Sequence, residues 1–397
     1  MKILVLNCGS SSIKYALYNM DDKSVMTSGG AERVGMEGAF VKVKLANGDK
    51  KKIMHDIPEH TEGVKFIFSL LTDPEIGVIK DLSEIDAVGH RMVHGGEKFN
   101  KSVILDKEVL ETFEACIDLA PLHNPANLKG VNAVSELMPS LPQVGVFDTA
   151  FHQSMPQKAF MYAIPYRLYK QYGVRRYGFH GTSHRYVSQR VCEFLGVSPI
   201  GKRIITCHIG NGGSIAAGGD GKCVDTSMGL TPLEGLMMGT RSGDIDGGAI
   251  TFLAKKLDLD ADGVSNLLNK KSGVAGITGG SSDMRDVENA AKSGDERAKL
   301  AQDMYFYRIK KYIGAYAAAM GGVDIIVFTA GVGENQISMR EAVCKDMEFL
   351  GIKFDKEKNK VRGEEAIISA DDSKVTVCVI PTDEELMIAT DTMNLLK

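Results

Sequence analysis

Cysteine spacings that would hold a metal or a disulfide framework are absent from this chain. Its seven cysteines are scattered, their number is odd, and none belongs to a C-x-x-C pair. The sequence therefore excludes a disulfide-stapled domain and a cysteine zinc site, and it fits a reducing cytosol. A signal peptide is not expected either, because the apolar run at residues 3–6 is too short for one. We expect a cytoplasmic protein.

A large excess of either charge is also lacking. The 47 basic and 51 acidic residues give a net charge of −4, and no basic block occurs. Proteins that bind nucleic acid or an anionic membrane usually carry such a block. We therefore expect a small-molecule partner, with no nucleic acid and no membrane.

Long hydrophobic runs are few. The most apolar segment, residues 313–333, carries one charge and is divided by Gly321 and Gly322. Because the enrichment in β-branched and aromatic residues begins only after these glycines, the segment predicts a helix through Met320, a turn, a buried strand at 324–329 and a glycine loop. A membrane span is not expected here.

Strand and helix patterns alternate along the whole chain. Helical patterns such as 107–120 and 298–320 lie among strands that are expected near Ile3, Tyr15, Ala87, Val144, Ile204, Ser214, Ile325 and Val375. This alternation predicts an α/β protein with mixed sheets. A length of 397 residues suits about two domains.

Two hairpins with polar tips recur about two hundred residues apart. Residues 3–18, ILVLNCGSSSIKYALY, predict a strand, a polar turn and a second strand; residues 204–219, IITCHIGNGGSIAAGG, repeat the arrangement. Hydroxyls, an amide and unpaired backbone N–H groups at such tips can hold phosphate oxygens or a metal. Ser, Asn and Gly are also ordinary turn formers. The repeat favours a duplicated domain whose two tips share a ligand.

A third glycine-rich tip, FTAGVGENQ at residues 328–336, follows the predicted strand and precedes a helical pattern. Gly331 and Gly333 remove side-chain bulk, and a helix N-terminus favours an anion. A nucleotide could approach this backbone closely. The alternative is a plain strand-to-helix turn, because G-x-G alone is not a dinucleotide fingerprint.

Two arginines and one aspartate occur where ligands bind in α/β proteins. Arg91, in GHRMVHGG, and Arg241, in MGTRSGDIDGG, are both expected on loops, and a guanidinium fork suits phosphate or carboxylate. Asp148 directly follows the predicted strand at 144–147, at the strand end where open sheets carry ligands. Surface charge, an ion pair and an Asx turn are the alternatives.

His180 and His184 lie four residues apart in YGFHGTSHRYV. A zinc pair is disfavoured, because the acid of H-E-x-x-H is missing and Gly181 with Thr182 is expected to start a helix between them. His180, just before that helix, is better placed to meet an anion.

The segment PTDEELMIAT predicts a capping box near the C-terminus. Thr382 would be the N-cap and Glu385 the residue three positions later. Glu384 either favours the helix dipole or points toward magnesium, which prefers hard oxygen ligands.

Eight motifs together resemble those of the acetate kinase family, in the family's order and spacing, from residue 3 to about 391. They are LNCGSSSIKY, GHRMVHGG, VFDTAFH, YGFHGTSHRYV, HIGNGGS, MGTRSGDIDGG, TAGVGENQ and PTDEE. The resemblance implies the fold of the acetate and sugar kinase, Hsp70 and actin superfamily, an α/β, duplicated two-domain, actin-like ATPase with mixed five-stranded sheets. Residues 1–149 and 385–397 would form the N-terminal lobe, and residues 150–384 the nucleotide-binding lobe. A homodimer is also implied.

The resemblance assigns roles to individual residues. Asn7 and Glu384 would hold Mg²⁺, or Mn²⁺ in its place. Residues that bind ATP or ADP would be Lys14, His208, Ile209, Gly210, Asn211, Gly212, Asp283, Met284, Arg285, Gly331, Val332, Gly333, Glu334 and Asn335. The methyl group of the substrate would lie in a pocket of Val93, Leu122, Phe179 and Pro232.

The catalytic residues implied by the resemblance are Arg91, Asp148, His180 and Arg241. Arg91 would engage the acyl substrate, while His180 and Arg241 would neutralise charge on the phosphoryl group in flight, as a loose transition state requires. Asp148 is the family's acid/base candidate. Because a carboxylate is already ionised at pH 7 and acetate needs no deprotonation, Asp148 is equally an organiser of magnesium, water or Arg91.

The expected reaction is reversible Mg²⁺-dependent phosphoryl transfer between ATP and acetate, giving acetyl phosphate and ADP. A propionate or butyrate kinase is an alternative, since one methylene in an apolar pocket contributes only about 1 to 3 kcal/mol. A second alternative is an ATP-hinged binding module on the same fold, which would hydrolyse ATP slowly without an acceptor.

Overall fold

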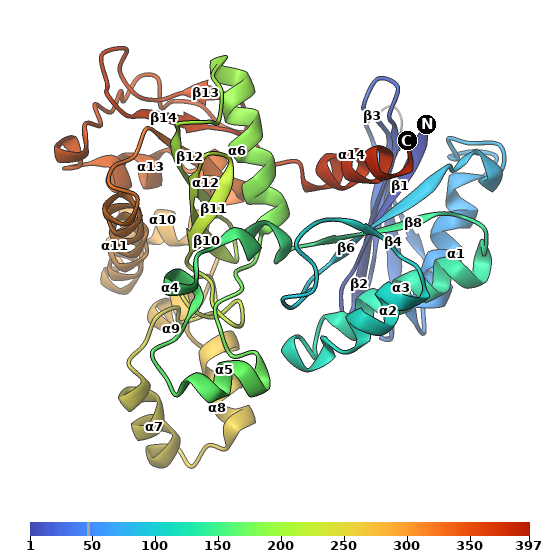
Figure 1. Cartoon of the computed structure of the whole chain (residues 1–397), viewed down its shortest axis with the longest axis horizontal. Helices are drawn as coiled ribbons and strands as arrows, with labels where there is room; N and C mark the ends of the chain where they lie inside the picture. Colours follow the sequence, from blue (N-terminus) through green and yellow to red (C-terminus); the bar gives the residue numbers. More distant parts are fainter. Residues whose placement is uncertain (46–47) are drawn as a thin grey trace. The chain divides into compact units, whose positions relative to one another are not determined.

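The computed structural model describes residues 1–45 and 48–397. The chain divides into two compact units (Figure 1). Unit 1 consists of Met1–Phe151 and Asp383–Lys397, and unit 2 of His152–Thr382. Because the last segment returns to the first unit, unit 1 is discontinuous in sequence.

Unit 1 contains a sheet of eight strands among its described residues, in the order β5-β4-β3-β2-β1-β6-β8-β7. Strands β1, β6 and β8 are parallel to one another, and the remaining pairs are antiparallel. The strands are β1 (Lys2–Cys8), β2 (Ser12–Asn19), β3 (Ser24–Glu32), β4 (Phe40–Lys44), β5 (Lys50–Met54), β6 (Ala87–Met92), β7 (Val103–Ile104) and β8 (Gln143–Phe147). The helices are α1 (His60–Leu71), α2 (Lys107–Glu114), α3 (Asn124–Leu137) and α14 (Glu384–Leu396).

Both faces of this sheet are covered. Leu4 and Leu6 of β1 pack in a core with residues of α1, while Ile3 and Val5, on the other face of the same strand, pack against Ile388 of α14. A strand buried on both faces reads as a continuous apolar run, which is the pattern of residues 3–6.

Unit 2 is built on a six-stranded sheet in the order β11-β10-β9-β12-β14-β13, as far as the structure describes the chain. Its strands are β9 (Arg203–Ile209), β10 (Gly213–Gly219), β11 (Lys222–Thr226), β12 (Ile325–Thr329), β13 (Ala366–Ile367) and β14 (Thr376–Val379). Its helices are α4 (Gln157–Phe160), α5 (Tyr166–Tyr172), α6 (Gly181–Leu195), α7 (Gly247–Lys256), α8 (Ala261–Lys270), α9 (Gly273–Thr278), α10 (Met284–Lys292), α11 (Glu296–Ala319), α12 (Ala330–Asn335) and α13 (Ile337–Cys344). Short 3₁₀ turns occur along the whole chain: η1 (Leu82–Glu84) and η2 (Ile117–Leu119) belong to unit 1, η3 (Ala150–Ser154) spans the boundary between the units in sequence, and η4 (Glu348–Leu350) belongs to unit 2.

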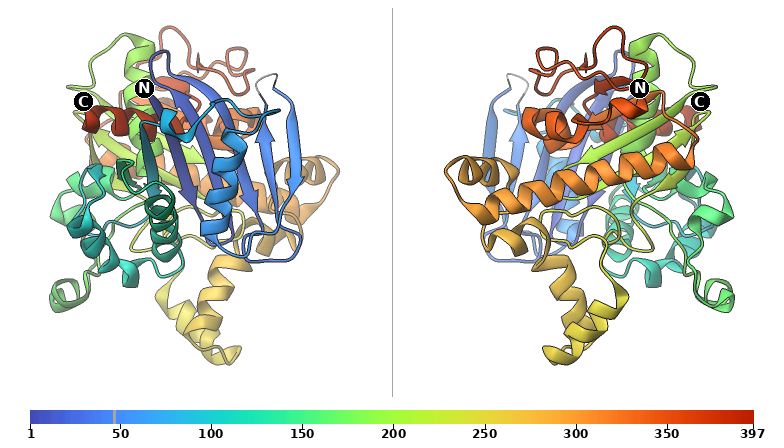
Figure 2. Two further views of the ribbon diagram at one scale, coloured as in Figure 1. Left: turned by 90° about the vertical axis from the view of Figure 1, so that its right-hand side faces the viewer. Right: turned by 90° about the vertical axis from the view of Figure 1, so that its left-hand side faces the viewer.

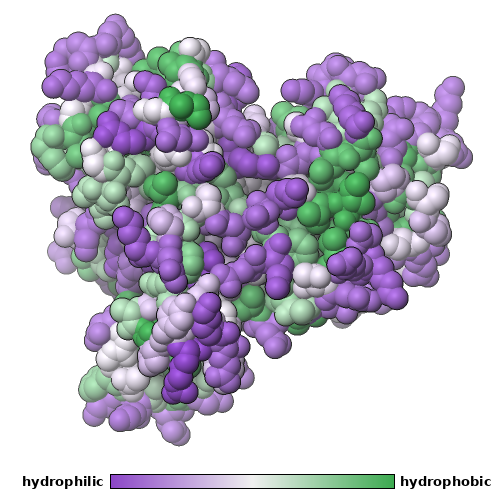
Figure 3. Space-filling model, in the orientation of Figure 1, coloured by the Kyte–Doolittle hydropathy of each residue, from purple (hydrophilic) through white to green (hydrophobic). Residues whose placement is uncertain are grey.

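Helices cover both faces of this sheet as well. The long helix α11 contacts β9 and β10 on one face, and α6 packs on β9 and β12 through Val187 and Val191 on the other. Helices α7 and α8 project from the rest of unit 2 (Figure 2). In the view of Figure 3, hydrophilic residues cover much of the surface and hydrophobic residues gather in patches on both units.

The two sheets share five strands in the same order and sense. In β3-β2-β1-β6-β8 and in β11-β10-β9-β12-β14, two antiparallel pairings are followed by two parallel ones. The predicted duplicated α/β fold is therefore confirmed. The expected strand number was wrong, because β4, β5 and β7 extend the first sheet and β13 extends the second.

Three local predictions were also wrong. The helical pattern at 107–120 is interrupted, since α2 ends at Glu114 and only the short η2 follows. The glycines after β12 lie in a helix, α12, rather than in a loop. The N-cap of α14 is Asp383, whose carboxylate accepts from the Leu386 N–H at 2.8 Å, and not Thr382.

In the described part of the chain, no helix combines the length and apolar character needed to span a membrane.

Candidate functional site

Three polar side chains occupy the carboxyl-terminal ends of adjacent parallel strands in unit 1. Asn7 lies on β1, Arg91 on β6, and Asp148 directly after β8. Since β1, β6 and β8 are parallel neighbours, their carboxyl ends meet at one edge of the sheet. The predicted position of Asp148 is confirmed, whereas Arg91 lies inside a strand and not on a loop.

Arg91 and Asp148 form a bidentate pair. Arg91 Nη2 donates to Asp148 Oδ2 at 2.5 Å and Nε to Oδ1 at 3.2 Å, while Nη1 lies 3.4 Å from Asn7 Oδ1. The Asp148 side chain is 1% exposed and that of Arg91 25%. Burial raises the pKa of Asp148 above its ordinary value, and Arg91 acts in the opposite direction. The pair fixes the plane of the guanidinium while one edge of it stays accessible.

Glu384 is the first residue of α14 and belongs to the same unit. Its carboxylate interacts electrostatically with Arg91 and Asp148. Burial raises the pKa of Glu384 to about 7, and the carboxylates of Asp148 and Glu385 add to the rise. A bound cation would stabilise the ionised forms of these neighbouring carboxylates.

The expected methyl-pocket residues of unit 1 differ in exposure. Val93, just after β6, is buried, and its N–H donates to Asn127 Oδ1 at 2.9 Å. Leu122 is 74% exposed. Asn127 also donates to the carbonyl of Cys8 at 2.9 Å, so this buried amide joins the end of β6 to the tip of the first hairpin. Sequence reasoning missed Asn127, because its partners lie far away along the chain.

The polar tip of the second hairpin begins the site in unit 2. The tip follows β9, and the Gly210 N–H donates to the Gly212 carbonyl at 3.0 Å. Gly239 of a distant loop donates to the Asn211 carbonyl at 3.0 Å, and a Cβ at Gly239 would collide with Asn211 Oδ1. A larger residue at position 239 would displace the Asn211 side chain from its place at the tip.

His180 is the N-cap of α6 and has a left-handed backbone with φ of 56°. The helix starts at Gly181, so the predicted helix start is confirmed. A Cβ built at Gly212 would lie 3.6 Å from His180 Nε2 and 3.7 Å from Arg241 Nη1. Unit 2 therefore brings the hairpin tip, His180 and Arg241 together.

Arg241 lies outside any helix or strand, as predicted, in the long segment between β11 and α7. Its Nη1 donates to the Pro232 carbonyl at 2.9 Å, and among the described residues it forms no ion pair. Burial lowers the pKa of Arg241 relative to an exposed arginine. A partly buried guanidinium without a carboxylate partner is a ready site for an anion.

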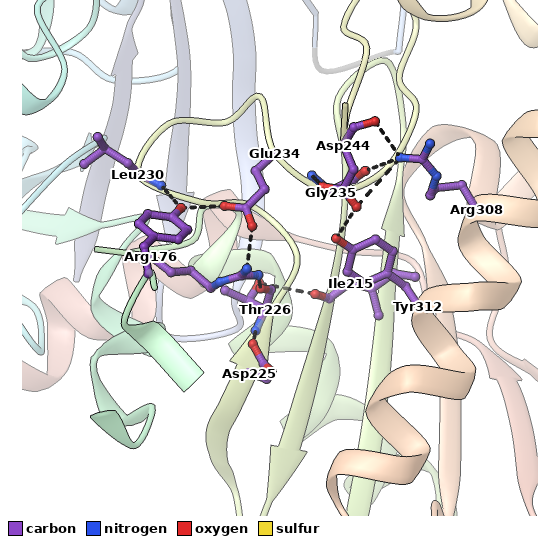
Figure 4. A network of polar contacts seen from close by, with 11 residues as sticks. Arg176, Ile215, Asp225, Thr226, Leu230, Glu234, Gly235, Asp244, Arg308 and Tyr312 are labelled. Atoms are coloured by element: carbon purple, nitrogen blue, oxygen red, sulfur yellow. Dashed lines mark hydrogen bonds and ion pairs between the residues drawn. The ribbon is translucent and has the colours of Figure 1, made fainter. Parts of the chain in front are cut away.

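A network of side chains holds this segment in place (Figure 4). Glu234 accepts from Arg176 Nη2 and from the Tyr162 hydroxyl, both at 2.5 Å. Asp244 accepts from the Gly235 N–H at 2.8 Å and from the Tyr312 hydroxyl at 2.7 Å. Both acids thus anchor the segment that carries Pro232 and Arg241.

Unit 2 also contains a cavity of about 520 Å³. Eight of the predicted nucleotide-binding residues line it, from three separate segments: Gly210, Asn211, Asp283, Met284, Arg285, Gly331, Val332 and Asn335. The sequence missed seven lining residues: Gly239, Val274, Ser282, Glu288, Tyr305, Gln336 and Arg362. Tyr305 lies on the predicted helix, and its hydroxyl donates to the Gly210 carbonyl at 3.4 Å.

Hydrogen bonds fix the segments that surround the cavity. Asp283 caps α10 by accepting from the Arg285 N–H at 2.9 Å, and hydrogen bonds from Arg285 lower the pKa of Asp283 to about 2. Glu334 accepts from the N–H of Ala330 at 2.7 Å and from that of Thr382 at 3.1 Å. The fully buried Arg340 donates to the Gly333 carbonyl at 2.9 Å. Sequence reasoning did not identify this arginine.

The other predicted residues of unit 2 lie next to the cavity lining in sequence but not in it. They are His208, Ile209, Gly212, Gly333 and Glu334. Phe179 and Pro232 neighbour His180 and Arg241: Phe179 is buried and precedes His180, and Pro232 accepts from Arg241. Lys14 lies in unit 1, on β2 opposite Asn7.

Comparisons with known proteins agree over the whole chain. Residues 2–390 match the acetokinase family. Curated relatives from Phocaeicola vulgatus and Bacteroides thetaiotaomicron, both called acetate kinase, are 72% identical over 100% of this chain and of theirs. The crystal structure of Porphyromonas gingivalis acetate kinase is similar with a TM-score of 0.98 and 61% identity, covering 100% of both chains. A propionate kinase from Francisella tularensis is similar with a TM-score of 0.92 and 42% identity over 99% of each chain.

Proposed function

The chain belongs to the acetokinase family, and we propose that it transfers the γ-phosphoryl group of ATP to acetate, reversibly, giving acetyl phosphate and ADP. The family resemblance seen in the sequence motifs is confirmed, and with it a phosphotransferase that uses a carboxyl group as acceptor. The individual site residues and the metal are part of the proposal.

The observation that carries this proposal is the arrangement within unit 2. A cavity of about 520 Å³, lined by the hairpin tip at Gly210 and Asn211, by α12 and by Asp283–Arg285, would hold the nucleotide. Next to the tip at Gly212, His180 Nε2 and Arg241 Nη1 would meet the transferred phosphoryl group. Donors fixed in advance stabilise charge that develops on the equatorial oxygens in the transition state.

In unit 1, Arg91 would bind the carboxylate of the acyl substrate. Both oxygens of Asp148 are already engaged by Arg91, which supports an organising role over that of a proton shuttle. Asp148 would hold the guanidinium in the orientation that a carboxylate or acyl phosphate needs.

Asn7 and Glu384 would hold Mg²⁺ or Mn²⁺. An amide oxygen and a carboxylate are hard ligands of the kind that Mg²⁺ takes, and Mg²⁺ usually binds through one or two protein oxygens plus phosphates and water. The raised pKa of Glu384 among other carboxylates fits a site that a cation would stabilise. When bound, the metal would neutralise charge on the phosphates.

Acceptor size would be set by apolar side chains near the two arginines. Val93 and Phe179 are buried, Pro232 contacts Arg241, and Leu122 is exposed. A propionate kinase is the second candidate, since a structure of that name aligns over nearly the whole chain. Residue types do not separate these acceptors, because one methylene has a small energetic effect.

Trapping of the acyl phosphate tests the proposed function. The purified chain is incubated with ATP, MgCl₂ and hydroxylamine, together with acetate, propionate or butyrate, and the hydroxamate is measured. We expect hydroxamate with the highest kcat/KM for acetate. ATP hydrolysis without hydroxamate would contradict a carboxylate kinase and favour the hinged binding module. A higher kcat/KM with propionate would replace acetate as the substrate.

We further propose that the protein is a cytoplasmic homodimer. All seven cysteines are buried free thiols, which supports a reducing compartment. The surface of α11 exposes Leu300, Met304 and Tyr307, by 51%, 38% and 62%. These positions share one helix face, and a second copy of the chain would cover it.

A further inference from the structure

Four histidines cluster in unit 2 around the start of α6. His180 stacks on His208 with 4.1 Å between ring centroids. His184 lies edge-on to His152, with 5.7 Å between centroids, and is tilted relative to His208, with 6.1 Å between centroids. The proposed function gives His180 a role but gives His184 none. His184 is completely buried on the first turns of α6.

A continuous chain of hydrogen bonds runs from His184 to His180. Thr206 Oγ1 lies 2.7 Å from His184 Nδ1, His184 Nε2 lies 2.7 Å from Ser214 Oγ, and Ser214 Oγ lies 2.9 Å from His180 Nδ1. Thr206 and Ser214 come from the neighbouring strands β9 and β10 and are 2% and 0% exposed. Thr206, His184 and Ser214 are therefore shielded from bulk water, whereas His180 is only partly buried.

Burial decides which atom donates and which accepts in each of these hydrogen bonds. In the part of the chain that the structure describes, His184 Nδ1 is the acceptor within reach of the Thr206 hydroxyl hydrogen. If Thr206 only accepted, its hydrogen would be buried without a partner, which is unfavourable. Thr206 therefore donates to His184 Nδ1.

The remaining protons follow from this first one. Burial lowers the pKa of His184 well below its ordinary value, as do His152 and His208, so His184 is neutral and has one N–H. That N–H is on Nε2 and donates to Ser214 Oγ. Ser214 then donates its own hydrogen to His180 Nδ1, which leaves the His180 hydrogen on Nε2.

We propose that Thr206, His184 and Ser214 are positioning residues that fix His180 as a neutral imidazole carrying its hydrogen on Nε2. His180 then serves the transferred phosphoryl group as a hydrogen-bond donor and not as a proton carrier. This extends the role given to His180 in the proposed function and rests on it for the identity of the acceptor.

The surroundings of His180 oppose a second proton. Protonation at Nδ1 would require Ser214 to turn its hydrogen toward His184 Nε2, which already carries one, so the whole chain would have to reverse. Among the groups that face the ring are His208, stacked on it, His184 behind Ser214, and Arg241, whose Nη1 lies beside the same glycine as His180 Nε2. The charge of Arg241 disfavours a positive imidazole.

The test uses Thr206→Val in the full chain. Valine keeps the shape of threonine but removes the hydroxyl that donates to His184. The hydrogen bonds from His184 to His180 can then run in either order of donor and acceptor with similar stability. Nuclear magnetic resonance of ¹⁵N-histidine-labelled protein, recorded at pH 7 without substrate, reports the tautomer of His180. We expect Nε2–H in the wild type, a mixture of tautomers in Thr206→Val, and the wild-type state again in Thr206→Ser.

Kinetics supply the second readout. Thr206→Val should lower kcat about tenfold, the equivalent of one lost hydrogen bond, and leave the Kd of ATP unchanged. Ser188→Ala is the matched control, since its hydroxyl bonds the backbone carbonyl of His184 and not the ring, and it should keep the wild-type tautomer. If thermal unfolding shows that Thr206→Val does not fold, Ser214→Ala breaks the same chain one link closer to His180, with the same expected change.

An Nδ1–H or doubly protonated His180 in the wild type at pH 7 would overturn the proposal. So would an unchanged tautomer and kcat in a folded Thr206→Val variant. Because the spectrum needs no substrate, it tests the relay even if no acyl phosphate forms, which separates failure of the relay from failure of the proposed function.

Discussion

At the scale of single residues, the two arginines of the site differ in the groups that hold them. Arg91 is held by a buried carboxylate, whereas Arg241 is held through a backbone carbonyl and keeps its charge uncompensated. The first arrangement orients a guanidinium and the second leaves it available to an anion. Substitution of Arg91 and substitution of Arg241 are therefore expected to have different effects on the enzyme.

Substitution of Arg241 should affect turnover far more than nucleotide affinity. An arginine that acts on transition-state charge contributes about 10³ to 10⁵ in rate, so Arg241→Ala should lose kcat in that range while the Kd of ATP changes little. Arg285→Ala is the comparison, because Arg285 is exposed at the rim of the cavity and should weaken ATP binding more than kcat. Equal losses of kcat and affinity in Arg241→Ala would contradict the assigned role.

Buried neutral histidines should make the protein sensitive to acid. Burial lowers the pKa of His90 to about 4, and it is 2% exposed with Nε2 2.7 Å from Gln143 Oε1. An unfolded histidine takes up its proton near pH 6.5, so stability due to His90 is complete above about pH 6.5 and is lost as the pH falls toward 4. The slope is about 1.4 kcal/mol per pH unit for one such group.

Urea unfolding of the wild type and of His90→Gln between pH 7 and pH 4.5 measures this effect. The variant should be less stable at pH 7 but should lose less stability on acidification. Its unfolding free energy should fall less steeply with pH than that of the wild type, by about 1.4 kcal/mol per pH unit. Parallel slopes would mean that His90 does not titrate between the two states as described.

At the scale of elements, the segment between β11 and α7 has no helix or strand and yet must hold Arg241 still. Glu234 ties it to Arg176, four residues before His180, and Asp244 ties it to Tyr312 of α11. Ion pairs and hydrogen bonds replace regular secondary structure here. The stability of this segment therefore depends on a few side chains.

Replacing Glu234 by alanine should loosen this segment. Arg176 and the Tyr162 hydroxyl would lose a half-buried acceptor, at a cost of about 2 kcal/mol of unfolding free energy, and kcat should fall while the Kd of ATP is kept. Glu193→Ala, which removes an exposed partner of Arg190, should change stability by less than about 1 kcal/mol. If both variants behaved alike, the network would not hold the segment.

Sequence reasoning succeeded where local chemistry decides the structure. The hairpin tips, the helix start at Gly181 and the place of Asp148 follow from turn residues, a glycine after an N-cap, and the end of an apolar strand. It failed where distant residues decide. Arg91 joins a strand because β6 has parallel partners on both sides.

The other failures have similar causes. Helix α12 begins directly after β12 because the Glu334 carboxylate accepts from the Ala330 N–H. Thr382 is not the N-cap because its hydroxyl bonds Ser183 at 2.8 Å instead. Strand β5, with the sequence KKKIM, was missed since an exposed edge strand rich in lysine lacks apolar alternation. Contacts of this kind are not visible in a single sequence.

At the scale of the whole molecule, one fold element occurs twice and is used for two tasks. Both units contain five strands in the same order. In unit 1 these strands position Arg91 and Asp148, and in unit 2 they position the glycine-bearing segments after β9 and β12 that line the cavity. The motifs of both units belong to the acetokinase family match at 2–390. The duplicated domain could be predicted because the hairpins repeat in sequence, whereas the kinase was predicted from the resemblance to the acetate kinase family.

The proposed homodimer can be tested on α11. Introducing a charge into the exposed apolar face, as in Met304→Glu, should disfavour burial against a second copy and give a monomer in analytical ultracentrifugation. Lys299→Glu, on an exposed position of the same helix outside this face, is the control and should leave the mass of the assembly unchanged. A dimer that persists in Met304→Glu would show that α11 does not form the interface.

The position of α14 has a consequence for synthesis on the ribosome. Residues Ile388 and Ala389 of this last helix cover Ile3 and Val5 of the first strand, and Gly89 is so close to α14 that a Cβ would strike Ile388. All of unit 2 leaves the ribosome before this cover exists. The face of β1 that carries Ile3 and Val5 therefore stays exposed in the nascent chain until α14 has been synthesised and has packed on it.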